Sequence, residues 1–321
     1  MTMLEATDLA VEFPGRSGRR ARAVDGVNLS VGAGEIVALV GESGCGKTTL
    51  ARTLLGLERP VAGQVRYDGT PLSYSGRALR AFRRQVQLVL QDPMGSLNPR
   101  HTVYEAVAEG PRIHGLPDEE KVVATALAQA GLRPPERFFH RFPHELSGGQ
   151  RQRVVIAGAL ALSPKVLIAD EPVASLDASV RGEILALMLR LRDELGLSAL
   201  VVTHDLGLAW NIADRVAVMY LGRIVESGPT EDVLTAPQHP YTQALLSVLP
   251  ESPERIILTG EPPDPTRIPA GCRFHPRCQL VAAGHGTDAC TSSPLAILPA
   301  IDTPQVACHV AAGKVSALDN S

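Results

Sequence analysis

The stretch from Gly41 to Thr48 constrains the fold of this chain more than any other part of the sequence. It reads GESGCGKT and fits the phosphate-binding pattern G-x-x-x-x-G-K-[ST]. The hydrophobic run from Glu35 to Val40 predicts a buried parallel strand before it, and a helix is expected to begin near Lys47. Glycines let several backbone N–H groups point at one centre, and the helix adds the positive end of its dipole. The pattern predicts a nucleotide-phosphate site; a plain glycine-rich turn is the alternative.

Two side chains of this loop have expected roles toward a magnesium nucleotide. Lys47 would reach the β- and γ-phosphates, and the Thr48 hydroxyl would hold Mg²⁺. We expect the nucleotide to contact Gly41, Glu42, Ser43, Gly44, Cys45, Gly46, Lys47, Thr48 and Thr49.

Composition limits the classes of protein to consider. A chain of 321 residues, of which 45% are hydrophobic, can form about two globular domains. The net charge of −3, from 31 Lys and Arg against 34 Asp and Glu, does not favour a nucleic acid as a partner. The sequence shows neither an apolar run of about 20 residues nor a signal peptide. We therefore expect a cytosolic protein. Any role at a membrane would need a partner that supplies the membrane-spanning segments.

The order of apolar runs predicts an α/β fold with a helical insertion. Strands are expected at 4–13, 23–31, 35–40, 63–67, 86–90, 165–170 and 199–203, with a hairpin over 215–226. Helices are expected at 47–57, 101–109, 118–130, 150–162 and 179–195, the last with a core stripe of Ile184, Met188, Leu191 and Leu195. The helical block at 92–162 interrupts the α/β pattern as an inserted subdomain. The arginine cluster at 77–84 is interpreted as a solvated face, and the proline-rich tail after residue 250 as irregular.

Two carboxylates end the apolar strand at 165–170. Asp170 suits a residue that holds Mg²⁺ through water, and Glu171 is placed to orient the water that attacks the γ-phosphate. A carboxylate pair that only caps the next segment is the alternative.

A second anion site is expected where Leu146–Gln150 opens a helix. Ser147 is a natural N-cap, and Gln150 completes a capping box. Glycines and exposed N–H groups at a helix start favour an anion. The expected contacts are Ser147, Gly148, Gly149 and Gln150.

Taken together, GESGCGKTT, LSGGQ, VLIADEP, SLDAS and His204 resemble the ATPase subunit of an ATP-binding-cassette (ABC) transporter over residues 1–235. The resemblance implies a P-loop NTPase fold with an antiparallel β subdomain and the inserted helical subdomain at 92–162. It also implies an ATPase that uses ATP and Mg²⁺. Two such subunits would pack head to tail, each nucleotide lying between the phosphate loop of one and the LSGGQ helix of the other.

Further roles are implied by position in this family. Phe13 would stack on adenine, or else be a strand core residue. Gln91 would sense Mg²⁺ and the attacking water, or else be a solvated loop residue. Asp177 would cross the dimer interface or simply N-cap a helix, and His204 would contact the γ-phosphate or be an ordinary histidine. The expected catalytic residues are Lys47, Gln91, Glu171 and His204, and the expected Mg²⁺ ligands are Thr48, Gln91 and Asp170.

Cys45 departs from the family pattern, in which Ser or Ala is usual. We hypothesise that the phosphate-binding amides lower the pKa of its thiol and make it sensitive to oxidation.

Three further stretches narrow the resemblance. Residues 91–100, 239–246 and 271–278 resemble segments of the oligopeptide and dipeptide importer ATPases, which also occur in nickel and glutathione importers. They imply a peptide-importer extension over 236–321. The implied partners are two multispanning permease subunits, an identical or homologous ATPase, and an extracytoplasmic binding protein, with this subunit at the cytoplasmic face of the membrane. The rivals are a non-transport ABC protein regulated by its tail, one that acts on ribosomes or DNA, and an exporter ATPase.

The tail also gathers thiols. Cys272, Cys278, Cys290 and Cys308 are four of the five cysteines and suit a Cys₄ site for zinc or an iron–sulfur cluster. The family resemblance favours a [4Fe–4S] cluster. His275 and His309 could replace a ligand in a zinc site, and four reduced core cysteines are the alternative.

Overall fold

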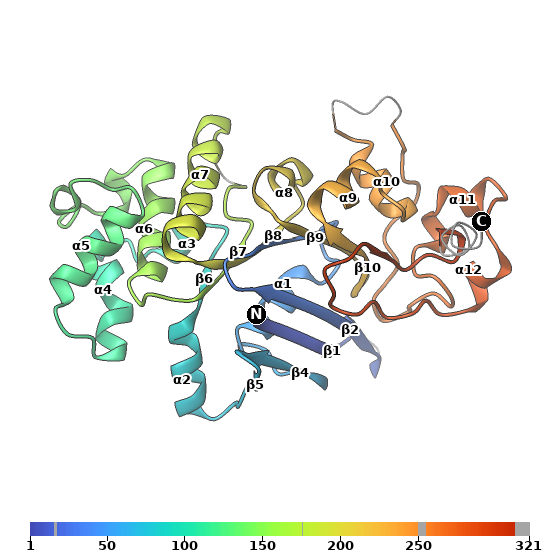
Figure 1. Ribbon diagram of the computed structural model, residues 1–321, viewed down its shortest axis with the longest axis horizontal. Helices are drawn as coiled ribbons and strands as arrows, with labels where there is room; N and C mark the ends of the chain where they lie inside the picture. Colours follow the sequence, from blue (N-terminus) through green and yellow to red (C-terminus); the bar gives the residue numbers. More distant parts are fainter. Residues whose placement is uncertain (16–17, 175, 250–254, 312–321) are drawn as a thin grey trace. The chain divides into compact units, whose positions relative to one another are not determined.

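The computed structural model describes residues 1–15, 18–174, 176–249 and 255–311. Figure 1 shows the helices and strands of the chain, coloured along the sequence. The chain forms two compact units. The first unit comprises Met1–Met3, Val31–Ile36 and Leu72–Val202, and the second comprises Leu4–Ser30, Val37–Pro71 and Thr203–Ser321. The boundary expected at residue 235 remains a prediction. Among the described residues, no helix has both the length and the apolar character needed to cross a membrane.

An antiparallel sheet lies mainly in the second unit. Its strand order is β2-β1-β4-β5, formed by β2 (Arg20–Gly32), β1 (Thr2–Pro14), β4 (Ala62–Tyr67) and β5 (Thr70–Pro71). Asp68 and Gly69 both adopt positive φ in the turn between β4 and β5, as two-residue hairpins require. The predicted antiparallel subdomain is confirmed.

The second unit also contains the strand that leads into the phosphate loop. This strand, β3 (Ile36–Val40), is fully buried and runs parallel to β9 (Arg215–Tyr220). The predicted hairpin is β9 with β10 (Arg223–Pro229). The tail adds β11 (Gln305–Val306) to the free edge of β10, which the sequence pattern did not predict.

Several helices complete the second unit. They are α1 (Lys47–Leu54), α8 (Leu206–Ile212), α9 (Thr230–Thr235), α10 (Pro240–Leu246), α11 (Gln279–Ala282) and α12 (Asp288–Ser292). The unpredicted α8 begins because Asp205 accepts a hydrogen bond from the Leu208 N–H. Phe274 of the tail joins a core cluster with Ala38 and Val40 of β3, so tail and loop-bearing strand share one core.

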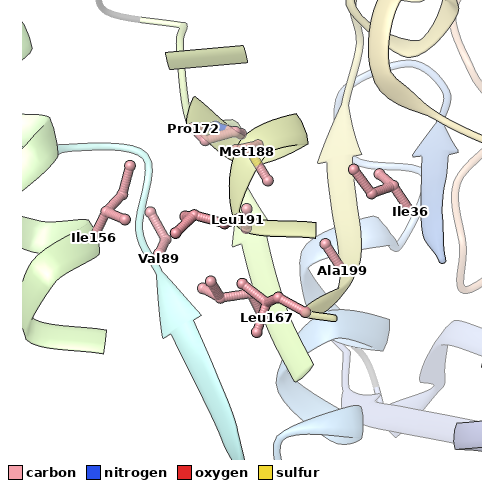
Figure 2. A pocket seen from close by; sticks show the side chains of 10 residues that line it. Ile36, Val89, Ile156, Leu167, Pro172, Met188, Leu191 and Ala199 are labelled. Carbon is pink, nitrogen blue, oxygen red and sulfur yellow. The ribbon is translucent and has the colours of Figure 1, made fainter. Parts of the chain in front are cut away.

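The first unit is built on three parallel strands. Their order is β8-β7-β6, formed by β8 (Ser198–Thr203), β7 (Val166–Asp170) and β6 (Val86–Val89). Figure 2 shows the apolar side chains that line a small pocket between these strands and the helices α6 (Gly148–Leu160) and α7 (Ala178–Leu195). A cavity with such apolar walls belongs to the core and is not a polar ligand site.

The packing of α7 differs from the predicted stripe at one position. Ile184, Met188 and Leu191 are buried as expected, but Leu195 is 44% exposed and Leu187 is buried instead. Leu195 is the last residue of the helix, where the chain turns away at Gly196 in the left-handed region. The end of the helix therefore leaves the core one turn earlier than the periodicity indicates.

Between β6 and β7 the described chain is helical. It contains α3 (Pro93–Ser96), α4 (Val103–His114), α5 (Glu119–Gln129) and α6. The predicted helical insertion is thus present. The arginine cluster forms an unpredicted helix, α2 (Gly76–Gln85), which buries only Phe82 and is N-capped by Ser75.

Candidate functional site

The glycines of the phosphate loop are required by close backbone contacts. A Cβ atom on Gly41 would lie 2.2 Å from the Met219 carbonyl oxygen, and one on Gly46 would lie 2.1 Å from that of Ala23. Gly46 also has a φ of 111°, a conformation that side chains rarely adopt. Only glycine lets the loop curl against β9 and β2 at these two positions.

Lys47 is held in position inside the loop. Its side chain is 7% exposed, and its Nζ donates to the Gly41 carbonyl at 2.6 Å and to the Glu42 carbonyl at 2.9 Å. The helix α1 begins at Lys47 without a side-chain cap in the described chain, and its first turn contains no acidic residue. A helix start of this kind favours a phosphate. Thr48 next to Lys47 is exposed, as a hydroxyl that is to reach an ion must be.

The hypothesis of a reactive Cys45 is wrong in its premise. Its side chain is buried, with Sγ 3.8 Å from Lys47 Nζ. Burial raises the pKa of the thiol, and this outweighs the lowering effect of Lys47. The thiol therefore stays protonated and less reactive than a free cysteine.

Two other expected site residues belong to the second unit. Phe13 lies near the end of β1 and is 37% exposed, so it is not part of the strand core. His204 is exposed and directly follows β8. Their roles toward the nucleotide stay predictions.

The first unit holds the acidic residues and Gln91 at the same edge of its sheet. Asp170 is the last residue of β7, and Gln91 follows β6, its parallel neighbour. Glu171 adopts a φ of 50°, and its N–H donates to the Val202 carbonyl of β8 at 2.8 Å. Non-glycine residues rarely adopt this conformation. Those that do are found disproportionately at functional sites.

The capping box at the start of α6 is confirmed. Ser147 Oγ accepts from the Gln150 N–H at 3.2 Å, and Gln150 Oε1 accepts from the Ser147 N–H at 3.1 Å. A Cβ on Gly149 would lie 2.6 Å from Val180 of α7, so this helix start packs closely on α7, while a Cβ on Gly148 would stay 3.6 Å from Leu176.

Asp177 precedes α7 and is exposed. Its side chain makes no capping hydrogen bond within the described chain. Capping of α7 therefore does not account for an aspartate at this position. Ser175 of the same motif lies outside the described residues.

The four tail cysteines line one pocket. Cys272, Cys278, Cys290 and Cys308 all line it, together with His275 and His309. All four are free thiols, and burial raises the pKa of Cys272 to about 11. Within the described residues, no three His, Cys, Asp or Glu side chains are arranged so that they could hold a metal ion. His275 Nδ1 and His309 Nε2 each contact a backbone carbonyl, which occupies one nitrogen of each ring.

Comparison with known proteins defines the class. Residues 24–174 match the family model described as ABC transporter. The chain resembles the structure of cbiO1 from Clostridium perfringens, part of the ABC transporter complex cbiONQ, with a TM-score of 0.66 and 33% identity over 73% of this chain and 91% of that chain. The dimeric cassette MJ0796 bound to ADP and Pi gives a TM-score of 0.62 and 29% identity over 71% and 99%. The fold is that of an ABC ATPase, which hydrolyses ATP to drive transport.

The tail and the relatives narrow this class. Residues 225–284 match the model described as oligopeptide/dipeptide transporter, C-terminal region. The putative oligopeptide transport ATP-binding protein YkfD of Bacillus subtilis is 44% identical over 87% of this chain and 88% of its own length. The dipeptide transport ATP-binding protein DppF of Escherichia coli is 44% identical over 86% of each. The chain belongs to the family of ATP-binding proteins of oligopeptide/dipeptide ABC transporters.

Proposed function

We propose that this ATPase powers the import of dipeptides or oligopeptides. The observation that carries the proposal is the match to peptide-transport ATP-binding proteins along both the cassette and the tail. The glycine contacts of the phosphate loop and the position of Lys47 support ATP binding in the same chain.

In this proposal the residues of one subunit divide the chemistry. Lys47 neutralises charge on the β- and γ-phosphates, and Glu171 orients the attacking water in line with the γ-phosphate. His204 contacts the γ-phosphate, and Phe13 stacks on adenine. Mg²⁺, when bound, would be held by Thr48, Gln91 and Asp170 and would supply further charge neutralisation. The exposed Thr48 hydroxyl and the shared sheet edge of Gln91 and Asp170 fit that role.

The nucleotide site is proposed to be completed by a second ATPase subunit, identical or homologous. The capped start of α6, with Ser147, Gly148, Gly149 and Gln150, would approach the γ-phosphate of a nucleotide held by the partner. Asp177 would cross the same interface. The exposure of Ser147 and Asp177 supports this arrangement.

A groove of the first unit is the proposed contact with a permease. It lies along β6, α4 and α6. Leu90 and Ile113, two exposed large hydrophobic residues, line it beside the charged residues Arg83 and Glu109. Leu90 directly precedes Gln91. An amphipathic cytoplasmic helix of a multispanning subunit that bound in this groove would therefore contact the chain next to Gln91 and could shift that residue. Such a contact would keep the chain at the cytoplasmic face of the membrane.

The thiol pocket is proposed to hold a [4Fe–4S] cluster, with zinc as the alternative. Cys272, Cys278, Cys290 and Cys308 are the proposed ligands, and their gathering around one space supports the proposal. Their arrangement would have to tighten on binding, and their protons would be released. Iron, sulfide and zinc analysis of anaerobically purified protein tests this. Folded protein free of all three would overturn it.

Co-purification tests the function itself. We expect the tagged chain to be recovered from membranes with two multispanning subunits. Its ATPase activity should rise when an extracytoplasmic binding protein is added with a dipeptide or oligopeptide. Stimulation by nickel- or glutathione-loaded binding protein instead would favour those importers. Full ATPase activity without any membrane partner, if it changed with the redox state of the metal site in the tail, would favour a regulatory ABC protein.

A further inference from the structure

The tail contacts the phosphate loop at Glu42. Arg277 donates two hydrogen bonds to the Glu42 carboxylate, from Nη1 to Oε2 at 2.7 Å and from Nη2 to Oε1 at 3.1 Å. The Arg277 side chain is only 6% exposed, and its guanidinium lies 6.0 Å from the centre of the Tyr220 ring. A bidentate contact of this kind fixes orientation as well as charge.

The tail also holds the backbone of the loop. The Glu42 N–H donates to the Tyr241 hydroxyl oxygen at 2.8 Å. The carbonyl of the same peptide group, that of Gly41, accepts from Lys47 Nζ at 2.6 Å. A trans peptide points its N–H and C=O in opposite directions. Tyr241 and Lys47 therefore bind the two polar groups at opposite edges of one peptide unit.

Tyr241 is itself fixed by packing. It is fully buried, and its ring centre lies 4.7 Å from that of Tyr220 and 5.3 Å from that of Phe274. Phe274 belongs to the segment Cys272–Cys278, which also carries Arg277. The packing of Phe274 therefore helps to hold the Tyr241 ring, and with it the hydroxyl, in place.

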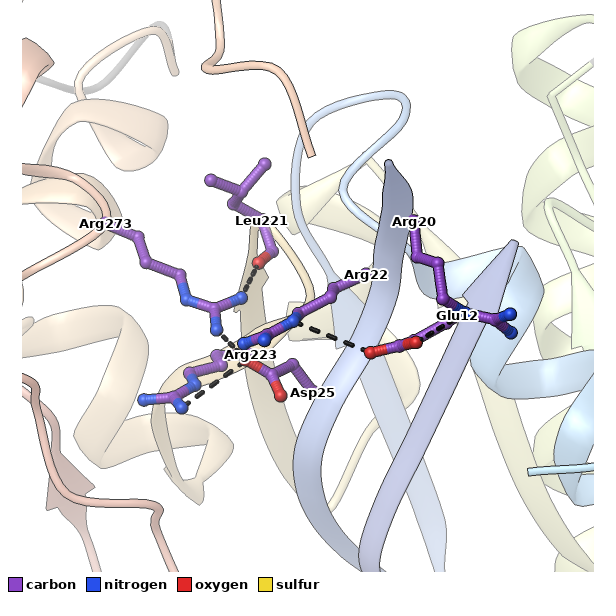
Figure 3. A network of polar contacts seen from close by, with 7 residues as sticks. All are labelled: Glu12, Arg20, Arg22, Asp25, Leu221, Arg223 and Arg273. Carbon is purple, nitrogen blue, oxygen red and sulfur yellow. Dashed lines mark hydrogen bonds and ion pairs between the residues drawn. The ribbon is translucent and has the colours of Figure 1, made fainter. Parts of the chain in front are cut away.

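Arg273 of the same segment makes a second connection. It donates to the Leu221 carbonyl and forms an ion pair with Asp25, as Figure 3 shows. Next to Leu221, the Gly222 N–H donates to the Cys45 carbonyl at 2.8 Å. The segment between the first two cysteines thus contacts the loop directly at one end and through the β9–β10 turn at the other.

We propose that Tyr241 and Arg277 are positioning residues for Lys47. By holding the Gly41–Glu42 peptide and the Glu42 side chain, the docked tail fixes the two carbonyls that aim the Lys47 ammonium. The affinity of the loop for ATP then depends on the docking of the tail. This inference rests on the proposed function only in that the loop binds ATP.

The test measures the affinity of the purified full-length chain for MgATP. Tyr241→Phe keeps the ring but removes the acceptor, so we expect affinity to fall about threefold to tenfold, as for one lost hydrogen bond. Arg277→Ala should weaken binding by about tenfold, and Arg277→Lys should restore part of it because the charge is kept. Arg267→Ala, which removes an exposed arginine of the same tail, should leave the affinity unchanged. Thermal unfolding of each variant shows that it is folded.

A double-mutant cycle separates positioning from general structural support. In a Lys47→Met background, Tyr241→Phe should have almost no further effect on MgATP affinity, because its effect acts through Lys47. An equal loss in both backgrounds would overturn the inference. So would wild-type affinity in folded Tyr241→Phe and Arg277→Ala. A wild-type chain that binds no MgATP would overturn the proposed function as well.

Discussion

The phosphate loop and the thiol pocket both lie in the second unit, but their geometry has different origins. The loop is shaped by contacts that its own glycines permit, such as Gly46 against the Ala23 carbonyl. The pocket gathers Cys272, Cys290 and Cys308 from separate short segments of the tail, with Phe274 in the same lining. A local motif thus provides the first site, which long-range contacts then hold in place, whereas long-range packing alone brings the residues of the second site together. Changes in the catalytic machinery should alter turnover without altering stability, whereas changes in the tail should alter stability or ATP affinity more than turnover.

The largest effect is expected on the catalytic side. Glu171→Gln keeps the size of the side chain but removes the carboxylate that orients water, so turnover should fall about 100-fold to 10,000-fold. MgATP binding and the thermal midpoint should stay as in the wild type, and ATP-bound dimers should accumulate. Phosphate release and size-exclusion chromatography with ATP measure this. Glu194→Gln, on the exposed surface of α7, is the control, and normal turnover in Glu171→Gln would remove its assigned role.

On the tail side, Phe274→Ala should act on stability first. Phe274 is fully buried between Tyr220 and Tyr241, and removing such a ring costs about 3 kcal/mol of unfolding free energy. Urea unfolding measures the loss. MgATP affinity should fall with it, because Tyr241 loses its support, while turnover at saturating ATP should change far less. A variant as stable as the wild type would show that the tail does not share the core of β3.

A smaller effect concerns pH and the start of α10. His239 is buried, burial lowers its pKa to about 3, and its Nδ1 accepts from the Tyr241 N–H at 3.0 Å. The unfolded chain takes up this proton near pH 6.5, whereas the folded chain does not. Stability is therefore complete above pH 6.5 and should fall by about 2 kcal/mol between pH 6.5 and pH 5.

His239→Asn keeps an N-cap acceptor without a titrating ring, so it should flatten this part of the pH profile. Urea unfolding at several pH values measures the slope, and His285→Asn on the exposed surface should keep it. An unchanged slope in His239→Asn would contradict the assignment.

The same contrast explains what the sequence could predict. The strands, the phosphate loop and the capping box at Ser147 were predicted because each depends on residues within a few positions of one another. The helix α2 was missed because its arginine-rich sequence buries only Phe82. The strand β11 was missed because its partner, β10, is far away in the chain.

The contacts that connect the tail with the loop were equally hidden. Glu42 and Arg277 are 235 positions apart, and Glu42 and Tyr241 are 199 positions apart. The motif around residues 239–246 marked Tyr241 only as part of a family resemblance, and no periodicity indicates what its hydroxyl contacts. Long-range polar contacts of this kind depend on the packed core that brings their residues together.

The smallest effect is expected at Cys45, where the loop and burial have opposite effects on the pKa of the thiol. Lys47 and the loop amides favour a thiolate, but burial dominates and raises the pKa of the thiol. Cys45→Ser should therefore keep ATPase activity within about twofold, because the loop binds phosphate through its backbone. Brief peroxide treatment should affect the wild type and Cys45→Ser equally, since any loss in both comes from other cysteines. A loss of activity that Cys45→Ser prevents would show that the loop amides, and not burial, control this thiol.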